Sequence, residues 1–232
     1  MEEADRARTP LLQQYSSVRR YFLENKRFHA TAEIVVRMTY EYPGHKSFAV
    51  ISEHGSGAVR KHVLRGIMDA ELEAASEPAR SATRISPRNY SFRLVESAFD
   101  QGRLCYVLEI APKTPNRFLI RGRIWVDAED LAIARIDGSP AQNPSFWVRR
   151  TAFVHTYQKL GRFWLPALNH SQTEARVFGH TEVRIEYSDY RIQESAPAAG
   201  NTASAAPDGA RPGAPRQDPL VESEYGEPRR ER

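Results

Sequence analysis

The sequence has a single cysteine, Cys105, which excludes an intramolecular disulfide and any zinc site built from several cysteines. Around it, Leu104, Tyr106 and Leu108 alternate with Cys105 and Val107, a pattern typical of a strand with one buried face. A lone thiol in such a strand is usually a small buried hydrophobe. We therefore predict no nucleophilic role for this thiol.

Long apolar runs are also missing. No stretch of about 18 apolar residues is present, so the sequence predicts no membrane-spanning helix. The first ten residues, MEEADRARTP, are acidic and polar, whereas a secretory signal peptide has a basic and then an apolar segment. Taken alone, this start predicts a cytoplasmic protein.

Signatures of catalysis and metal binding are absent as well. The sequence has no glycine-rich phosphate loop, no HExxH, no GxSxG and no recognisable Cys-His-Asp arrangement. His29 and His155 alternate with apolar neighbours, where a hydrogen-bonded histidine is commoner than a metal ligand. The acidic turn at Asp127, Glu129 and Asp130 lacks the glycine and the further ligands of a calcium loop. We predict no catalytic residue, no metal and no cofactor.

Charge of one sign is not concentrated along the sequence. The net charge is +4, and the arginines are spread singly through the expected strands. This mild basic excess does not predict a nucleic-acid partner, and it would suit an anionic lipid or an acidic protein surface equally well.

Composition divides the chain into two parts. Residues 194–232 are rich in Pro, Ala, Gly and charged residues and have almost no aliphatic side chains. Such a segment cannot bury enough apolar surface to offset the entropy of ordering, so we expect a disordered tail. Residues 1–193 have aromatic and branched residues throughout and are predicted to form one domain.

Residues 117–138 contain the clearest structural signal, a hairpin. Its two strands alternate, and Asp side chains, which favour turns, lie between them. In the first strand one face holds Phe118, Ile120, Gly122, Ile124 and Val126, and the other holds Arg121, Arg123 and Trp125. In the second strand Leu131, Ile133 and Arg135 alternate with Ala132, Ala134 and Ile136.

Two segments show helical spacing. Thr9 and Pro10 are a good helix start, and a helix to about Asn25 would place on one face Leu11, Tyr15, Val18 and Phe22. The second helix is expected over residues 59–80. Its apolar side would carry Val59, Val63, Leu64, Ile67, Met68 and Leu72, and its outward side Glu71, Glu73 and Glu77.

The remaining elements alternate with period two. The longest strand is expected over residues 27–40, with Phe28, Ala30, Ala32, Ile34, Val36, Met38 and Tyr40 on one face. Its length, about twice the average, suits a strongly curved sheet or barrel. Further strands are expected near residues 47–53, 90–94, 104–110, 147–159, 163–177 and 181–192. About nine strands and two helices predict an antiparallel α+β fold of sandwich, half-barrel or barrel type.

The sequence resembles the LolA-like superfamily of outer-membrane lipoprotein-sorting proteins, which includes LolA, LolB and RseB. The resemblance covers about residues 10–192. It rests on an amphipathic helix that leads into the strand at Phe28, on the hairpin RIWVDAEDLAIARIDG, on the phrase YQKLGRFWLPA with Gly161, Trp164 and Pro166, and on the final strand IEYSDYRI. It implies a curved antiparallel sheet forming an incomplete, half-open β-barrel, with amphipathic helices covering an apolar cavity for acyl chains.

The resemblance also implies a function. We expect a non-enzymatic, monomeric protein of the periplasm or cell envelope that binds lipid or the acyl chains of a lipoprotein, with an envelope protein as a further partner. The alternative is a protein-binding sensor module of the RseB type, and a hydrolase, which would need a clustered Ser, His and Asp, ranks third. This location conflicts with the polar start, so we suppose that the given start lies downstream of the natural one. The expected cavity lining is Ile34, Val36, Met38, Val63, Ile67, Met68, Ile120 and Ile124. Strand arginines that could serve as the family's functional arginine are Arg37, Arg93, Arg121, Arg123 and Arg135.

The composition of the tail generates a first prediction. Ending the chain after Gln193 should leave the melting temperature within about two degrees of the full chain, because the tail has too few apolar residues to dock. Circular dichroism melts of the two chains test this. A markedly lower melting temperature for the shortened chain would show that the tail packs on the domain.

Overall fold

A computed structural model describes residues 1–114, 118–143, 146, 148–177 and 179–194. These residues fall within one compact unit, Met1–Ala196. The residues expected to form a disordered tail, from 195 on, lie outside the described part, so the domain boundary stays a prediction. No helix in the described ranges is both long and apolar enough to cross a membrane.

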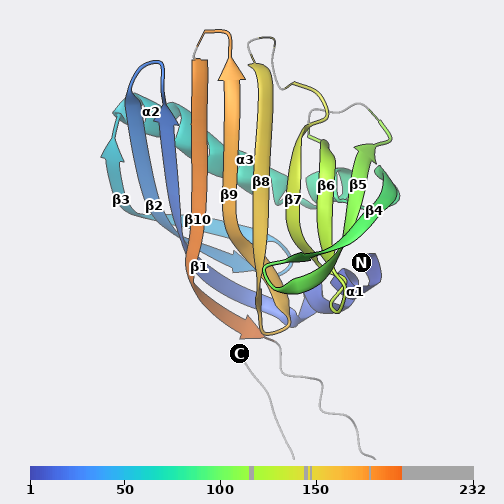
Figure 1. Ribbon diagram of the computed structural model, residues 1–232. Coiled ribbons are helices and arrows are strands. Elements are labelled where there is room, and N and C mark those ends of the chain that lie inside the picture. The colour runs from blue at the N-terminus through green and yellow to red at the C-terminus, as the bar shows by residue number, and fades with distance from the viewer. Residues whose placement is uncertain (115–117, 144–145, 147, 178, 195–232) are drawn as a thin grey trace, which may run out of the picture. The chain divides into compact units, whose positions relative to one another are not determined.

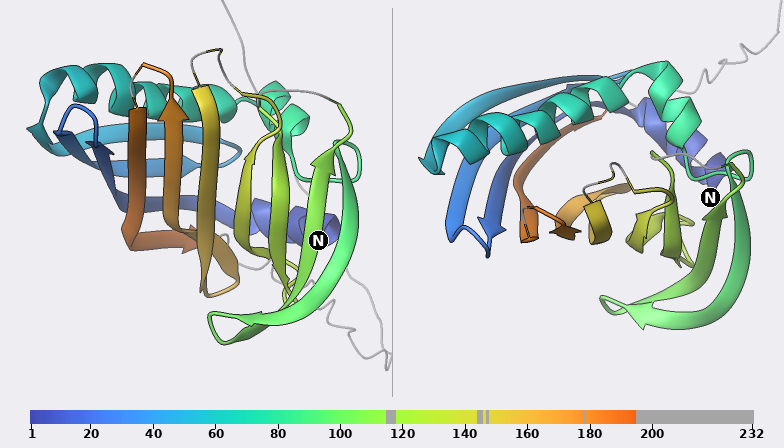
Figure 2. Two further views of the ribbon diagram at one scale, coloured as in Figure 1. Left: turned by 45° about the horizontal axis from the view of Figure 1, so that its top comes forward. Right: turned by 90° about the horizontal axis from the view of Figure 1, so that it is seen from above.

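Ten strands of the described chain form a single antiparallel sheet in the order β3-β2-β1-β10-β9-β8-β7-β6-β5-β4 (Figure 1). The sheet is curved (Figure 2). It is also open, because β3 and β4 stand at opposite ends of the strand order and do not pair with each other in the described chain. The strands are β1 (Leu12–Asn25), β2 (Ala30–Glu41), β3 (His45–Gly55), β4 (Tyr90–Asp100), β5 (Arg103–Pro112), β6 (Ile120–Asp127), β7 (Ile133–Pro140), β8 (Val148–Leu160), β9 (Phe163–Ala175) and β10 (Gly179–Glu194). The predicted α+β half-open barrel is confirmed.

Short helices carry the chain from one edge of the sheet to the other. Strand β3 ends at one edge and β4 begins at the opposite edge, so the connection between them crosses one face of the sheet (Figure 2). It contains α2 (Gly57–Val59), the π-helical turn η2 (Arg60–Leu64), α3 (Arg65–Ala74) and α4 (Glu77–Thr83). Before β1 lie α1 (Glu2–Arg8) and the 3-10 turn η1 (Thr9–Leu11).

The helix predicted from Thr9 to Asn25 is wrong, because this segment is strand β1. Its buried side alternates through Tyr15, Ser17, Arg19, Tyr21, Leu23 and Asn25. The polar members of that series hide the period of two, and pairing along its length with β2 and β10 outweighs the local helical spacing. The chain therefore has ten described strands rather than nine, and the helix of the resemblance is replaced by the short α1.

The second predicted helix is interrupted. Residues Ala75 and Ser76 separate α3 from α4, which has Pro78 in its first turn, where the missing N–H of proline is tolerated. Glu71 was expected to face solvent, and this is also wrong: its carboxylate turns toward the sheet and pairs with Arg19. On β2 the predicted face is buried from Ala32 to Tyr40, whereas Phe28 lies beyond the strand and is 56% exposed.

The central hairpin follows its prediction closely. Ile124 pairs with Ile136, and both are buried. Gly122 has φ +148°, and a Cβ there would lie 2.1 Å from the Asp137 carbonyl oxygen, so the close approach of β6 and β7 requires glycine. In the turn, Asp127 Oδ1 accepts hydrogen bonds from the backbone N–H groups of Glu129 and Asp130.

The buried position of Ile124 generates a second prediction. Ile124→Asp should abolish soluble folding, because an unpaired carboxylate in this core costs several kcal/mol. The control is Arg123→Asp on the exposed side of the same strand, which should fold. Soluble expression and near-ultraviolet circular dichroism compare the two. Well-folded Ile124→Asp protein would contradict the placement of the core.

Candidate functional site

The helical connection packs on part of the sheet. Leu64 and Met68 are buried against Tyr21 and Ile34 of the neighbouring strands β1 and β2 and against Ile185 of β10. Amphipathic helices cover sheets in this way because both elements bury an apolar face. The helices therefore close off the face formed by β1, β2 and β10.

The structure distributes the predicted cavity lining over three core clusters. One cluster, under the helices, contains Ile34, Val36, Ile67 and Met68. Met38 lies in a second cluster with Tyr15, Tyr40, Phe163 and Leu165. Ile120 and Ile124 lie in a third, with Tyr90, Ile110, Leu119 and Val126. The side chain of Val63 is outside the described part. The described members lie on apolar faces, as expected from the sequence, but in different clusters, so their common role as a cavity lining stays a prediction.

A buried ion pair joins the helices to the sheet. Arg19, in the middle of β1, is 1% exposed, and its guanidinium lies 2.6 Å from a carboxylate oxygen of Glu71 on α3. The other carboxylate oxygen lies 2.6 Å from Nζ of Lys46 on β3. Burial disfavours the charge of Glu71, but Arg19 and Lys46 outweigh it and hold the pKa of this carboxyl below its ordinary value. The pair is therefore ionised.

Aromatic rings enclose the Arg19 guanidinium. Its central carbon lies 4.9 Å from the ring centroid of Tyr187 and 5.6 Å from that of Phe48, within cation–π range. Its Nε has no hydrogen-bond partner in the described part of the chain. Burial raises the pKa of Tyr187 and raises that of Tyr15 to about 12. These hydroxyls stay protonated at neutral pH, so Arg19 and Lys46 are the cations and Glu71 the anion of this cluster.

Two small cavities border this ion pair. One, about 300 Å³, lies between α3 and strands β8 to β10 and includes in its lining Ile67, His155, Tyr157, Leu168, Ile185 and Tyr187. The other, about 370 Å³, includes Tyr15, Tyr40, Lys46, Trp164 and Leu165. Glu71 and Pro166 border both, so the carboxylate that Arg19 holds stands at their boundary. Burial lowers the pKa of His155 to about 4, although Asn169 opposes the shift, and the ring is neutral at pH 7.

A third, larger space lies beyond the helical cover. It is a groove of about 550 Å³ over strands β4 to β6, beside α1, and we call it the apolar groove. Its lining is Met1, Glu2, Pro87, Phe92, Leu94, Tyr106, Leu108, Val126 and Leu131. Three of these are large apolar residues left open to solvent, since Leu94 is 61%, Leu131 41% and Tyr106 40% exposed. The third core cluster, with Ile120 and Ile124, packs against Phe92 and Leu108 beneath it.

The acidic turn has a structural role. Arg103 pairs with Asp127 and Glu129, Lys159 Nζ lies 2.7 Å from Asp130, and Trp164 Nε1 donates to Asp130 at 2.8 Å. The turn thus ties β5, β8 and β9 together. Among the described residues, no group of three or more His, Cys, Asp or Glu could hold a metal ion.

Sequence reasoning missed Arg19 and Glu71. The arginines it considered were Arg37, Arg93, Arg121, Arg123 and Arg135, whereas the buried arginine lies in the segment taken for a helix. The alternation of Tyr15, Tyr21 and Leu23 was a signal for the strand, but nothing local indicated a partner 52 residues away. Phe92, Leu94, Tyr106, Leu108, Val126 and Leu131 of the apolar groove were assigned to strands and not recognised as a site.

Comparisons with known proteins find similar chains among solved structures alone. No family model matches the chain, and no curated protein matches it. One similar solved structure is a DUF1329 family protein from Desulfovibrio piger, with 14% identity, coverage of 84% of this chain and 92% of that chain, and a TM-score of 0.40. A second is a domain described as an outer-membrane lipoprotein-sorting protein from Vibrio parahaemolyticus, with 11% identity, coverage of 84% and 93%, and a TM-score of 0.39. A third is a LolA superfamily protein from Nitrosomonas europaea, with 9% identity, coverage of 83% and 93%, and a TM-score of 0.35. The second and third of these carry names of the group that the sequence resembles. At such TM-scores the likeness says nothing about ligand or partner.

The ion pair generates a third prediction. Glu71→Leu should lower the free energy of unfolding by about 3 to 5 kcal/mol, because it leaves the Arg19 charge buried and unpaired. Adding Arg19→Met should restore most of this loss, since the double variant removes the fully buried charge and leaves Lys46, whose side chain is 20% accessible. Urea denaturation measures the cycle.

Glu73→Leu is the matched control, because Glu73 lies on the same helix and is exposed. It should change stability by less than about 0.5 kcal/mol. If Glu71→Leu were as harmless as Glu73→Leu, the ion pair would not hold α3 on the sheet.

Proposed function

We propose that this protein is a non-enzymatic, carrier-like protein of the cell envelope that binds an acyl chain of a lipid or lipoprotein in the apolar groove. The observation that carries the proposal is the groove itself, an unfilled space with an almost wholly apolar lining. Soluble proteins usually cover such surface, and a solvent-open apolar patch marks an interaction site.

The size and lining of the groove suit an acyl chain. Its volume of about 550 Å³ falls within the range of ligand sites, roughly 300–1,000 Å³. Glu2 is the one charged side chain among its described lining residues. Each methylene buried there contributes about 0.8 kcal/mol, so a long chain needs no polar contact to bind.

The space under α3 plays a different part in this proposal. Ile34, Val36 and Met38 are fully buried there, and the neighbouring cavities are small and partly polar. A ligand would reach this lining only if α3 separated from Arg19. We therefore assign the first acyl contact to the groove, beneath whose lining Ile120 and Ile124 lie in the third core cluster, and keep the lining under α3 as a second compartment.

A rival proposal is a protein-binding sensor. Strand β4 is an edge of the sheet, and Phe99 is 77% and Val95 36% exposed on it. An edge strand with apolar side chains can accept an extended peptide by β-augmentation. A peptide ligand would use the backbone edge of β4, whereas an acyl chain would use the groove.

Leu94→Glu tests the proposal and is our fourth prediction. Leu94 lines the groove and is largely exposed, so the variant should fold, while a carboxylate in the apolar lining should weaken binding of a fluorescent fatty-acid probe by about tenfold or more. Fluorescence titration gives both dissociation constants.

Ile51→Glu is the matched control. Ile51 is 54% exposed on β3, the opposite edge, and lines none of the cavities described above. This variant should bind the probe as the wild type does. No probe binding by folded wild type, or equal weakening by the two substitutions, would contradict the groove proposal and favour the sensor.

A further inference from the structure

One end of the sheet has an unusual composition in its connections. Residues 26–29, 113–119, 141–147 and 176–178 join β1 to β2, β5 to β6, β7 to β8 and β9 to β10 at the same end (Figure 1). These four sequences contain no Asp or Glu. Their described cations are Lys26, Arg27, Lys113 and Arg176. We call this end of the sheet the basic end.

Each of these connections also presents a large apolar side chain to solvent. Phe28 is 56%, Phe118 61%, Phe146 73% and Val177 46% exposed. They come from four different connections, so they form a row along the basic end rather than one local cluster. A single exposed apolar side chain needs no explanation, but one at each of four successive connections along the sheet suits an interaction surface.

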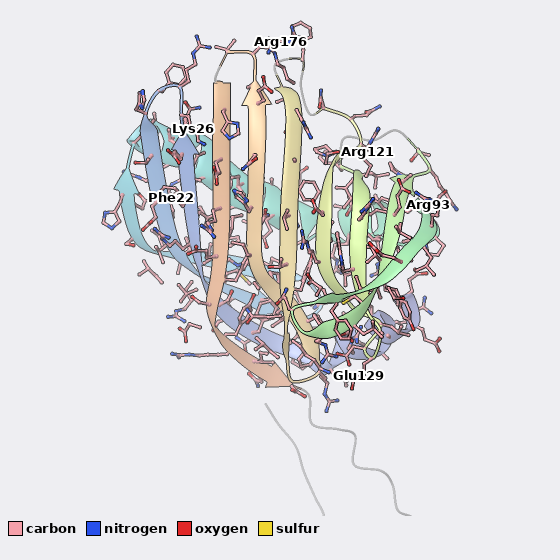
Figure 3. The ribbon with its side chains drawn as sticks, in the orientation of Figure 1. Phe22, Lys26, Arg93, Arg121, Glu129 and Arg176 are labelled. Atoms are coloured by element: carbon pink, nitrogen blue, oxygen red, sulfur yellow. The ribbon has the colours of Figure 1, made fainter. Side chains whose placement is uncertain are left out.

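Cations lie directly beside these aromatic rings. The guanidinium carbon of Arg176 is 4.7 Å from the ring centroid of Phe146, which links two neighbouring connections, and that of Arg27 is 5.9 Å from the ring of Phe28. Figure 3 shows Lys26, Arg121 and Arg176 toward this end and Glu129 at the other. Paired aromatic and cationic groups suit a membrane interface, where the ring enters the apolar layer and the cation meets phosphate.

The basic end also has a hollow large enough for a lipid headgroup. It measures about 860 Å³, and its charged lining is Lys113, Arg121, Arg149, Arg150, Glu109 and Asp137. Both carboxylates have arginine partners outside the hollow, since Arg93 pairs with Glu109 and Arg135 with Asp137. Arg149 has Glu174 as a partner at 3.3 Å. The hollow therefore keeps an excess of positive charge.

The opposite end of the sheet lacks this pattern. Its connections, residues 42–44, 101–102, 128–132 and 161–162, contain Glu129, Asp130 and Arg162 as their charged residues. The net charge of +4 is thus not spread evenly. The cations are gathered where the aromatic residues are exposed.

We propose that the basic end docks on an anionic phospholipid membrane. The aromatic side chains enter the interface, and the lysines and arginines meet lipid phosphates, one of which occupies the hollow. This inference goes beyond the proposed function, because it uses none of the residues of the apolar groove. It predicts binding that depends on anionic lipid and weakens as salt screens the charges.

The test is sedimentation of the full chain with vesicles of phosphatidylcholine containing about one third phosphatidylglycerol, with pure phosphatidylcholine vesicles for comparison. The wild type should bind the anionic vesicles only. The variant Lys26→Gln/Arg150→Gln/Arg176→Gln should lose about a hundredfold in partitioning, at roughly fivefold per cation. Phe28→Ser/Phe146→Ser should also weaken binding, by about tenfold.

The matched control is Arg37→Gln/Arg162→Gln/Arg191→Gln. These arginines are exposed, with side chains 39%, 57% and 74% accessible, and lie away from the basic end, so the net charge changes equally. This control should bind within about threefold of the wild type. If both triple variants lost vesicle binding equally, the effect would depend on net charge alone, and this result would contradict the proposed docking surface. Failure of the wild type to bind anionic vesicles would also contradict the proposal, and it would favour an acidic protein partner.

Two cross-checks separate this inference from the proposed function. Leu94→Glu should still bind anionic vesicles, and the triple variant at the basic end should still bind the fatty-acid probe. Release of vesicles by millimolar inorganic phosphate, with no effect of Phe28→Ser/Phe146→Ser, would show a phosphate site alone and would contradict membrane docking.

Discussion

The ion pair between Arg19 and Glu71 is the constraint on which the arrangement of the domain depends. A strand arginine that is 1% exposed is tolerated because a helix carboxylate reaches it at 2.6 Å, and that carboxylate is in turn held by Lys46. Removing Glu71 leaves the Arg19 charge buried without a carboxylate partner, which is strongly destabilising. The pair therefore fixes where α3 crosses the sheet, and with it which strands the helices cover and which stay open.

The consequence is a sheet with two unlike halves. Under α3, strands β1, β2 and β10 bury their apolar side chains in a packed core, and the residual cavities are small and partly polar. Over β4 to β6 the described chain contributes α1 and the segment after α4, and the apolar groove remains open. A flexible acyl chain is a ligand that such a groove can bind without specific polar contacts, because burial of methylene groups supplies the free energy.

Much of the fold could be predicted from the sequence, because it rests on local patterns. The alternation of Ile120, Ile124 and Val126 and the turn at Asp127 appear in the structure as expected. What failed depended on contacts between distant residues. Arg19 and Ser17 look like the polar side of a helix until Glu71 and the neighbouring strands are known. Likewise, the cations of the basic end are separated by up to 150 positions, from Lys26 to Arg176, and only the topology of the sheet brings them together.

The central claim, that the apolar groove receives the acyl chain, is tested most directly by photo-crosslinking. A fatty acid with a diazirine near its methyl end would be irradiated with the full chain, and the labelled peptides identified by mass spectrometry. The account predicts labels on peptides that contain Phe92 and Leu94, Tyr106 and Leu108, or Val126 and Leu131. Labels confined to α3 and strands β8 to β10, or spread evenly over the surface, would contradict it.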